Sequence, residues 1–215
     1  MLFRPIAVFD SGLGSLSVVR ELRKIIPSEN ILYFADRMNF PYGKKSKDQL
    51  KPIIINSIKF LEKYRPKLIV MASNTPSVQI FEEIKNEFSI DIIPTKPPLK
   101  KAVKMSAKNH IAIMASSGIL NSKEFKYLIN REIPQDVFIT KIDSTDIIDL
   151  VENGSFLSDR TLTSKTIQMI IKSNFDDSID VVALSSTHLP FIKNYLVDLL
   201  PSIKFIDSSA YVAKD

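Results

Sequence analysis

The chain has 215 residues, of which 45% are hydrophobic and 25% charged, as in an ordinary soluble globular protein with one large domain or two small ones. It contains no cysteine and only two histidines, which excludes disulfides, zinc–thiolate sites and thiol catalysis, so we predict no metal and no cofactor. The net charge of +5 permits an anionic partner, but the lysine clusters lack interleaved aromatic residues for base stacking, and we expect no nucleic acid.

The sequence shows no membrane or export signal. No apolar run approaches the roughly 18 residues that a transmembrane helix needs. The N-terminal residues 1–5 lead straight into a strand pattern and lack the features of a signal peptide. We therefore expect a cytoplasmic protein without a membrane partner.

The first half of the chain alternates short β-branched runs with amphipathic patterns. We predict strands at residues 5–10, 31–36, 68–72 and 90–94, and helices at residues 16–26, 47–64 and 76–88. Pro41 and Gly43 mark a loop after the second strand, and Pro66 limits the second helix.

A proline-rich stretch around residues 94–98 ends this series, and a second series follows. We predict strands at residues 110–116, 137–143, 180–185 and 203–207, and helices at residues 99–107, 122–132, 146–154, 161–173 and 189–200, with a helix starting in the tail. Strands that alternate with helices imply parallel βαβ units with right-handed crossovers. The fold class is therefore α/β, and the break near residue 95 indicates two lobes.

Polar side chains gather where the predicted strands end. In open α/β sheets, ligands bind outside the carboxyl ends of the strands. The groups expected there are Asp10, Ser11, Gly12 and Gly14; Pro41, Tyr42 and Gly43; Ser73, Asn74 and Thr75; Ala115, Ser116, Ser117 and Gly118; and Ser186, Thr187 and His188.

Two of these strand ends share one pattern. "VMASNTPSV" and "VALSSTHLPF" each place a serine at the tip of an apolar strand, a threonine close behind it, and then a proline and a helix. If the lobes face each other, Ser73 and Ser186 approach one ligand from opposite sides. The alternative is that both serines only cap the helices that follow, a position where serine is preferred.

The stretch "DSGLGSLS" permits a different interpretation. Gly12 and Gly14 between a strand and a helix fit part of the dinucleotide-binding fingerprint, and Asp36 stands near the place of the ribose-binding acid. Ser17 occupies the place of the third glycine. A nucleotide-binding module therefore stays open, beside a simple glycine-rich turn that needs no ligand.

Taken together, "IAVFDSGLGSLSVV", "ILYFADRMNFPYG", "SNTPS", "SSTHLP" and "FIDSS" resemble the glutamate racemases, within the cofactor-independent aspartate/glutamate racemase superfamily. The resemblance spans the chain in order. It implies two pseudo-symmetric lobes, each a parallel sheet flanked by helices, with the amino acid in a cleft between them. The last strand and the tail would return to the first lobe, so we expect lobes at residues 1–96 plus 207–215 and at 97–206.

The family reaction uses one cysteine from each lobe, because inversion requires an acid and a base on opposite faces of one carbon. The resemblance places these cysteines at Ser73 and Ser186. A thiol ionises near about 8.5 and is readily tuned downward. A serine hydroxyl becomes reactive only with a dedicated base, for which Asp10 and His188 are the candidates. We therefore expect impaired racemisation.

Other positions also depart from the family pattern. Ile119 stands where the family often has a threonine, and "PTKPPL" replaces a stretch that resembles Glu-Pro-Gly. Two explanations stay open: a natural relative that lost its activity and kept a binding cleft, or a racemase whose cysteines were replaced deliberately. Glu152 matches an acidic family position loosely, and the alternative for it is a solvated carboxylate at a helix end.

We therefore predict an amino-acid racemase-like protein that acts on or binds glutamate or aspartate, and we lean towards an isomerase independent of pyridoxal phosphate. The alternative is a non-catalytic binding or regulatory protein on the same scaffold. The expected catalytic groups are Ser73, Ser186, Asp10 and His188, and the expected binding groups are Ser11, Pro41, Tyr42, Gly43, Asn74, Thr75, Ser116 and Thr187. A homodimer stays open as well.

Overall fold

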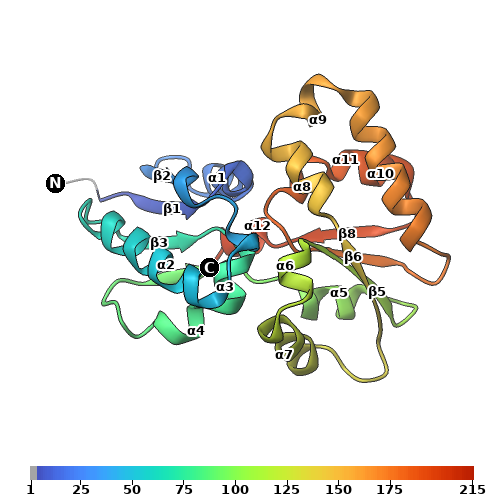
Figure 1. Ribbon diagram of the computed structural model, residues 1–215, viewed down its shortest axis with the longest axis horizontal. Helices are drawn as coiled ribbons and strands as arrows, with labels where there is room; N and C mark the ends of the chain where they lie inside the picture. Colours follow the sequence, from blue (N-terminus) through green and yellow to red (C-terminus); the bar gives the residue numbers. More distant parts are fainter. Residues whose placement is uncertain (1–3) are drawn as a thin grey trace. The chain divides into compact units, whose positions relative to one another are not determined.

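The computed structural model describes residues 4–215. Residues 1–3, part of the N-terminal segment in which no export signal was predicted, lie outside the described residues. The chain forms two compact units. One runs to Lys96 and takes up Ser209–Asp215, and the other spans Pro97–Ser208. Each unit is a four-stranded parallel sheet flanked by helices, so the predicted two-lobed α/β fold is confirmed (Figure 1). No helix between residues 4 and 215 is long and apolar enough to cross a membrane.

The first sheet contains β1 (Ile6–Asp10), β2 (Ile31–Ala35), β3 (Leu68–Met71) and β4 (Ile92–Pro94) in the order β2-β1-β3-β4. All its neighbouring strands are parallel. Every residue of β1 is buried, because this strand lies inside the sheet with helices on both faces. This explains why its sequence is a continuous apolar run rather than an alternating one.

The side chains of successive residues in the central strands point to opposite faces of this sheet. Phe9 and Met71 belong to a core shared with helix α2 (Lys47–Glu62), with Ile80 at the end of the short helix α3 (Asn74–Gln79), and with α4 (Phe81–Ile84). Val8 and Val70 belong to the core on the other face, which α1 (Leu16–Ile25) and the tail cover.

The second sheet contains β5 (His110–Ala115), β6 (Phe138–Asp143), β7 (Val181–Leu184) and β8 (Lys204–Asp207) in the order β6-β5-β7-β8. It is also parallel throughout and repeats the topology of the first sheet strand for strand. Its helices are α5 (Leu99–Met105), α6 (Ser117–Leu120), α7 (Lys123–Glu132), α8 (Thr145–Glu152), α9 (Ser155–Ser158), α10 (Arg160–Asn174) and α11 (Lys193–Leu199).

Two predicted helices are each divided in two. The helix expected at 76–88 is α3 and α4, separated at Ile80 and ending at Ile84. It starts earlier than predicted because a proline is tolerated in the first turn, where Pro76 lies. The helix expected at 189–200 is a 3₁₀ turn, Leu189–Phe191, followed by α11.

The expectation that the last strand returns to the first lobe is wrong. β8 pairs with β7, with Ile206 opposite Ala183, and therefore completes the second sheet. Only the tail belongs to the first unit, where α12 (Ser209–Val212) packs against α1 and buries Val212 and Ala213 in its core. The first unit therefore resumes at Ser209 rather than at residue 207.

Candidate functional site

The candidate groups of the first unit lie where β1 and β3 end. After β1 the chain moves to β2 on one side, and it then crosses to β3 on the other side, so the topological switch point lies between β1 and β3. Phe9 pairs with Met71, and the Ala72 N–H donates to the Phe9 carbonyl at 2.9 Å. Ser11 and Ser73 therefore leave the sheet from neighbouring strands at its carboxyl edge.

Asp10 and Ser11 form a buried polar pair at the end of β1, with 2% and 4% of their surfaces exposed. The Ser11 N–H donates to Asp10 Oδ1 at 2.7 Å. The Ser11 hydroxyl accepts a hydrogen bond from the Tyr42 N–H at 3.4 Å. The loop after β2 is thereby joined to the end of β1, as the sequence predicts for groups at one sheet edge.

Tyr42 is buried, and its phenol donates to Asp36 Oδ2 at 3.0 Å. The side-chain amide of Asn39 donates to both oxygens of the same carboxylate at 2.9 Å. Burial, helped by the nearby carboxylates, raises the pKa of Tyr42 far above its ordinary range. The Asp36 oxygens thus bind protein groups that hold the Phe40–Gly43 loop, and they do not present a free acid to a ribose.

The glycine turn "DSGLGS" is held by a residue that the sequence does not single out. Tyr33, on β2, donates from its phenol to the Gly12 carbonyl at 3.0 Å and accepts from the Ser15 hydroxyl at 3.2 Å. Burial raises the pKa of the Tyr33 phenol. A half-buried tyrosine on an edge strand carries no sequence signal of this role, because its partners lie in the turn that follows β1.

Ser73 and Asn74 stand at the start of α3 without the contacts that a cap would make. Ser73 is the N-cap residue, but its hydroxyl makes no capping hydrogen bond. Asn74 is 3% exposed, and neither its amide nitrogen nor its amide oxygen has a partner among the described residues. Thr75 is buried beside them. Capping therefore does not explain the serine and the amide at this strand end.

In the second unit, β5 and β7 flank the equivalent switch point, and the Ser185 N–H donates to the Met114 carbonyl at 2.8 Å. Ser116 is the N-cap of α6 and makes no side-chain capping bond. Ser186 accepts from the His188 N–H at 3.4 Å rather than capping a helix. Thr187 is buried next to it.

His188 and Glu152 form a buried pair inside the second unit. His188 Nε2 lies 2.8 Å from Glu152 Oε2, and the two side chains are 8% and 6% exposed. The alternative of a solvated carboxylate at the end of α8 is therefore wrong for Glu152. The carboxylate fixes the orientation of the imidazole ring.

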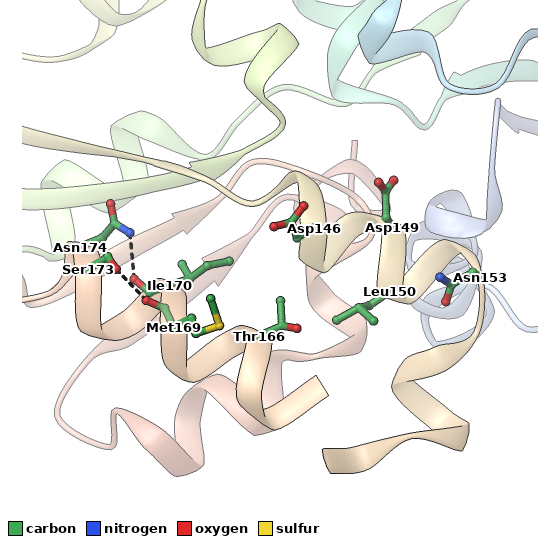
Figure 2. A pocket seen from close by; sticks show the side chains of 9 residues that line it. All are labelled: Asp146, Asp149, Leu150, Asn153, Thr166, Met169, Ile170, Ser173 and Asn174. Atoms are coloured by element: carbon green, nitrogen blue, oxygen red, sulfur yellow. Dashed lines mark hydrogen bonds between the residues drawn. The ribbon is translucent and has the colours of Figure 1, made fainter. Parts of the chain in front are cut away.

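A separate groove of about 400 Å³ lies between α8 and α10, and Figure 2 shows its lining. Asp146 and Asp149 are exposed, and the Asp149 carboxylate points away from α10. Asn174 and Ser173 donate to carbonyls of their own helix. None of the predicted site residues lines this groove, and nowhere in residues 4–215 do three or more His, Asp or Glu side chains cluster as metal ligands would.

No protein-family model matches the chain. A glutamate racemase of Clostridium botulinum is 34% identical over 202 residues, which cover 92% of this chain and 76% of that relative. The structure of Escherichia coli glutamate racemase with L-glutamate and the activator UDP-MurNAc-ala is similar, with a TM-score of 0.89 and 26% identity over 98% of this chain and 80% of that one. Francisella tularensis glutamate racemase in complex with D-glutamate gives a TM-score of 0.80 at 28% identity, covering 100% of this chain and 79% of that one.

Proposed function

The chain belongs to the glutamate racemase family, and we propose that it binds glutamate or aspartate through the polar groups at the strand ends of its two units. Racemisation by the chain as it stands is impaired, because serine occupies both positions proposed for the acid and the base. Two relatives with solved structures hold L-glutamate and D-glutamate, which supports this ligand class.

The Asn74 side chain carries the proposal. A buried polar group without a partner costs about 1–3 kcal/mol, and Asn74 buries both an unpartnered donor and an unpartnered acceptor. An amino acid offers the matching pair, a carboxylate that accepts from the amide nitrogen and an ammonium that donates to the amide oxygen. Asn74 stands at a topological switch point, where α/β sheets bind ligands.

The proposed chemistry assigns one proton-transfer group to each unit. Ser73 and Ser186 would flank the α-carbon, with Asp10 and His188 as the groups that could activate them. The Asp10 carboxylate already accepts the Ser11 N–H, and His188 is held by Glu152. A serine alkoxide that deprotonates a weak carbon acid demands more from such a neighbour than a thiolate does. Binding is therefore the part of the family function that we expect to persist.

The remaining binding groups come from both units in this proposal. In the first unit they are Ser11, Thr75 and the Pro41–Gly43 loop, and in the second they are Ser116 and Thr187. The second candidate function, a non-catalytic amino-acid-binding protein, shares all of these groups. It differs from an impaired racemase only in its expected activity after Ser73 and Ser186 are both replaced by cysteine: an impaired racemase regains racemisation, and a binding protein does not.

Calorimetric titration of the unaltered protein with D- and L-glutamate, D- and L-aspartate and ATP tests the ligand class. We expect binding of an acidic amino acid and no binding of the nucleotide. Asn74→Ala should weaken that binding at least about tenfold, because hydrogen bonds to charged groups contribute about 1.5–3 kcal/mol.

Asn174→Ala is the matched control, since the Asn174 amide donates to the Ile170 carbonyl within α10. This variant should leave the affinity unchanged. A protein that binds ATP and ignores all four amino acids would instead support the nucleotide-binding alternative.

A further inference from the structure

We propose that Thr95 is a further binding residue of the first unit, whose hydroxyl donates a hydrogen bond to a carboxylate of the acidic amino acid. The inference rests on the proposed function and deepens it, because it names a group that recognises the ligand's negative charge. Thr95 belongs to "PTKPPL", the stretch that departs from the family pattern.

The backbone of Thr95 is fixed at the carboxyl edge of the first sheet. Thr95 directly follows β4, and its N–H donates to the Met71 carbonyl at 3.1 Å and to the Ser77 hydroxyl at 2.9 Å. The Ser77 hydroxyl in turn donates to the same Met71 carbonyl at 3.2 Å. The ends of β3 and β4 are therefore held together by one serine of α3.

Ser77 also relates Thr95 to Asn74. Residues three apart lie on one side of a helix, with about 5–6 Å between their Cβ atoms. Asn74 and Ser77 have this spacing in α3, and Ser77 contacts the Thr95 backbone. Asn74 and Thr95 are thus both neighbours of Ser77, in one region of the first unit.

The Thr95 hydroxyl is fully buried, at 0% exposure, and has no hydrogen-bond partner among the described residues. A buried threonine normally satisfies its hydroxyl, as Thr163 does by donating to the Asp159 carbonyl at 2.9 Å. Unsatisfied buried groups in native proteins call for a bound water, an ion or a ligand. Thr95 and Asn74 are the two residues in the described part of the chain with such side-chain atoms, and both neighbour Ser77.

The chemistry around Thr95 favours a carboxylate over other ligands. The neighbouring Lys96 does not supply the charge, because its ammonium pairs with Glu82 at 3.0 Å and lies over the Phe81 ring. Recognition of a carboxylate at this edge therefore depends on neutral donors. Thr95 Oγ1 and Asn74 Nδ2 are two such donors, and both lack an acceptor among residues 4–215.

Thr95→Val removes the hydroxyl and keeps the shape of the side chain, whereas Thr95→Ser keeps the hydroxyl. Titration calorimetry with the preferred amino acid should show binding weakened about tenfold in Thr95→Val and largely retained in Thr95→Ser. The melting temperature of ligand-free Thr95→Val should not fall, because the variant removes an unpartnered buried group. Thr163→Val is the control, which should lose stability and keep its affinity.

Three outcomes decide the inference. Weakened binding in Thr95→Val, with recovery in Thr95→Ser, supports it. Equal binding by the unaltered protein and Thr95→Val overturns it and leaves the proposed function standing, with a bound water as the partner of the hydroxyl. If the unaltered protein binds no acidic amino acid, the proposed function and this inference both fail.

Discussion

At the scale of single residues, the serines at positions 73 and 186 lead to a prediction about racemase activity. The unaltered chain should show little racemisation of glutamate or aspartate, because neither hydroxyl offers an accessible anion near neutral pH. The double variant Ser73→Cys and Ser186→Cys should restore it. Either single variant should do less, since inversion needs a competent group on each face of the carbon, although one thiol could still exchange the α-proton.

Incubation in heavy water, with deuterium uptake and optical purity followed together, measures both processes. Circular dichroism and glutamate titration of each variant control for lost folding or lost binding. If the double variant folds and binds glutamate but shows no racemisation, the non-catalytic binding protein is favoured. Rapid racemisation by the unaltered chain would contradict our account of why serine fails.

At the scale of elements, the Phe40–Gly43 loop depends on Tyr42 and the Asp36 carboxylate. Burial raises the pKa of Tyr42 above the value of about 10 that it has in an unfolded chain. Above that pH the unfolded state loses this proton while the folded state keeps it. The free energy of unfolding should therefore fall as the pH rises above about 10.

Absorbance titration near 295 nm checks this, because Tyr42 should ionise only when the protein unfolds. Tyr42→Phe should reduce the pH dependence of stability in this range. At neutral pH the same variant should lower the free energy of unfolding by about 1.5–3 kcal/mol, because the buried Asp36 carboxylate loses a donor. An unchanged alkaline slope would contradict the raised pKa of Tyr42, and an unchanged free energy of unfolding at neutral pH would show that Asp36 does not depend on this phenol.

At the scale of the whole molecule, helix α12 contributes Val212 to the core of the first unit. Val212 is 5% exposed and packs with Val18 and Leu22 of α1. Val212→Asp should lower the free energy of unfolding by about 3 kcal/mol or more, because it buries an unpaired charge. Hydrogen exchange should show the loss of protection in β1–β4, while β5–β8 keep theirs.

Val197→Asp is the control for this substitution, since Val197 lies on α11 of the second unit and is 41% exposed. It should change stability little. Loss of protection in β5–β8 on Val212→Asp would mean that the two units do not unfold as separate bodies.

The sequence by itself determined the alternation of strands and helices, the two lobes and the placement of polar groups at the strand ends. These follow from local patterns, such as the apolar run of β1 and the proline break near residue 95. Only the tertiary structure decided that β8 completes the second sheet, because a strand's partner depends on hydrogen bonds between distant segments. The same holds for the Glu152–His188 pair and for the unpartnered Thr95 hydroxyl. The surroundings of these side chains are set by residues far away in the chain, and no local pattern encodes them.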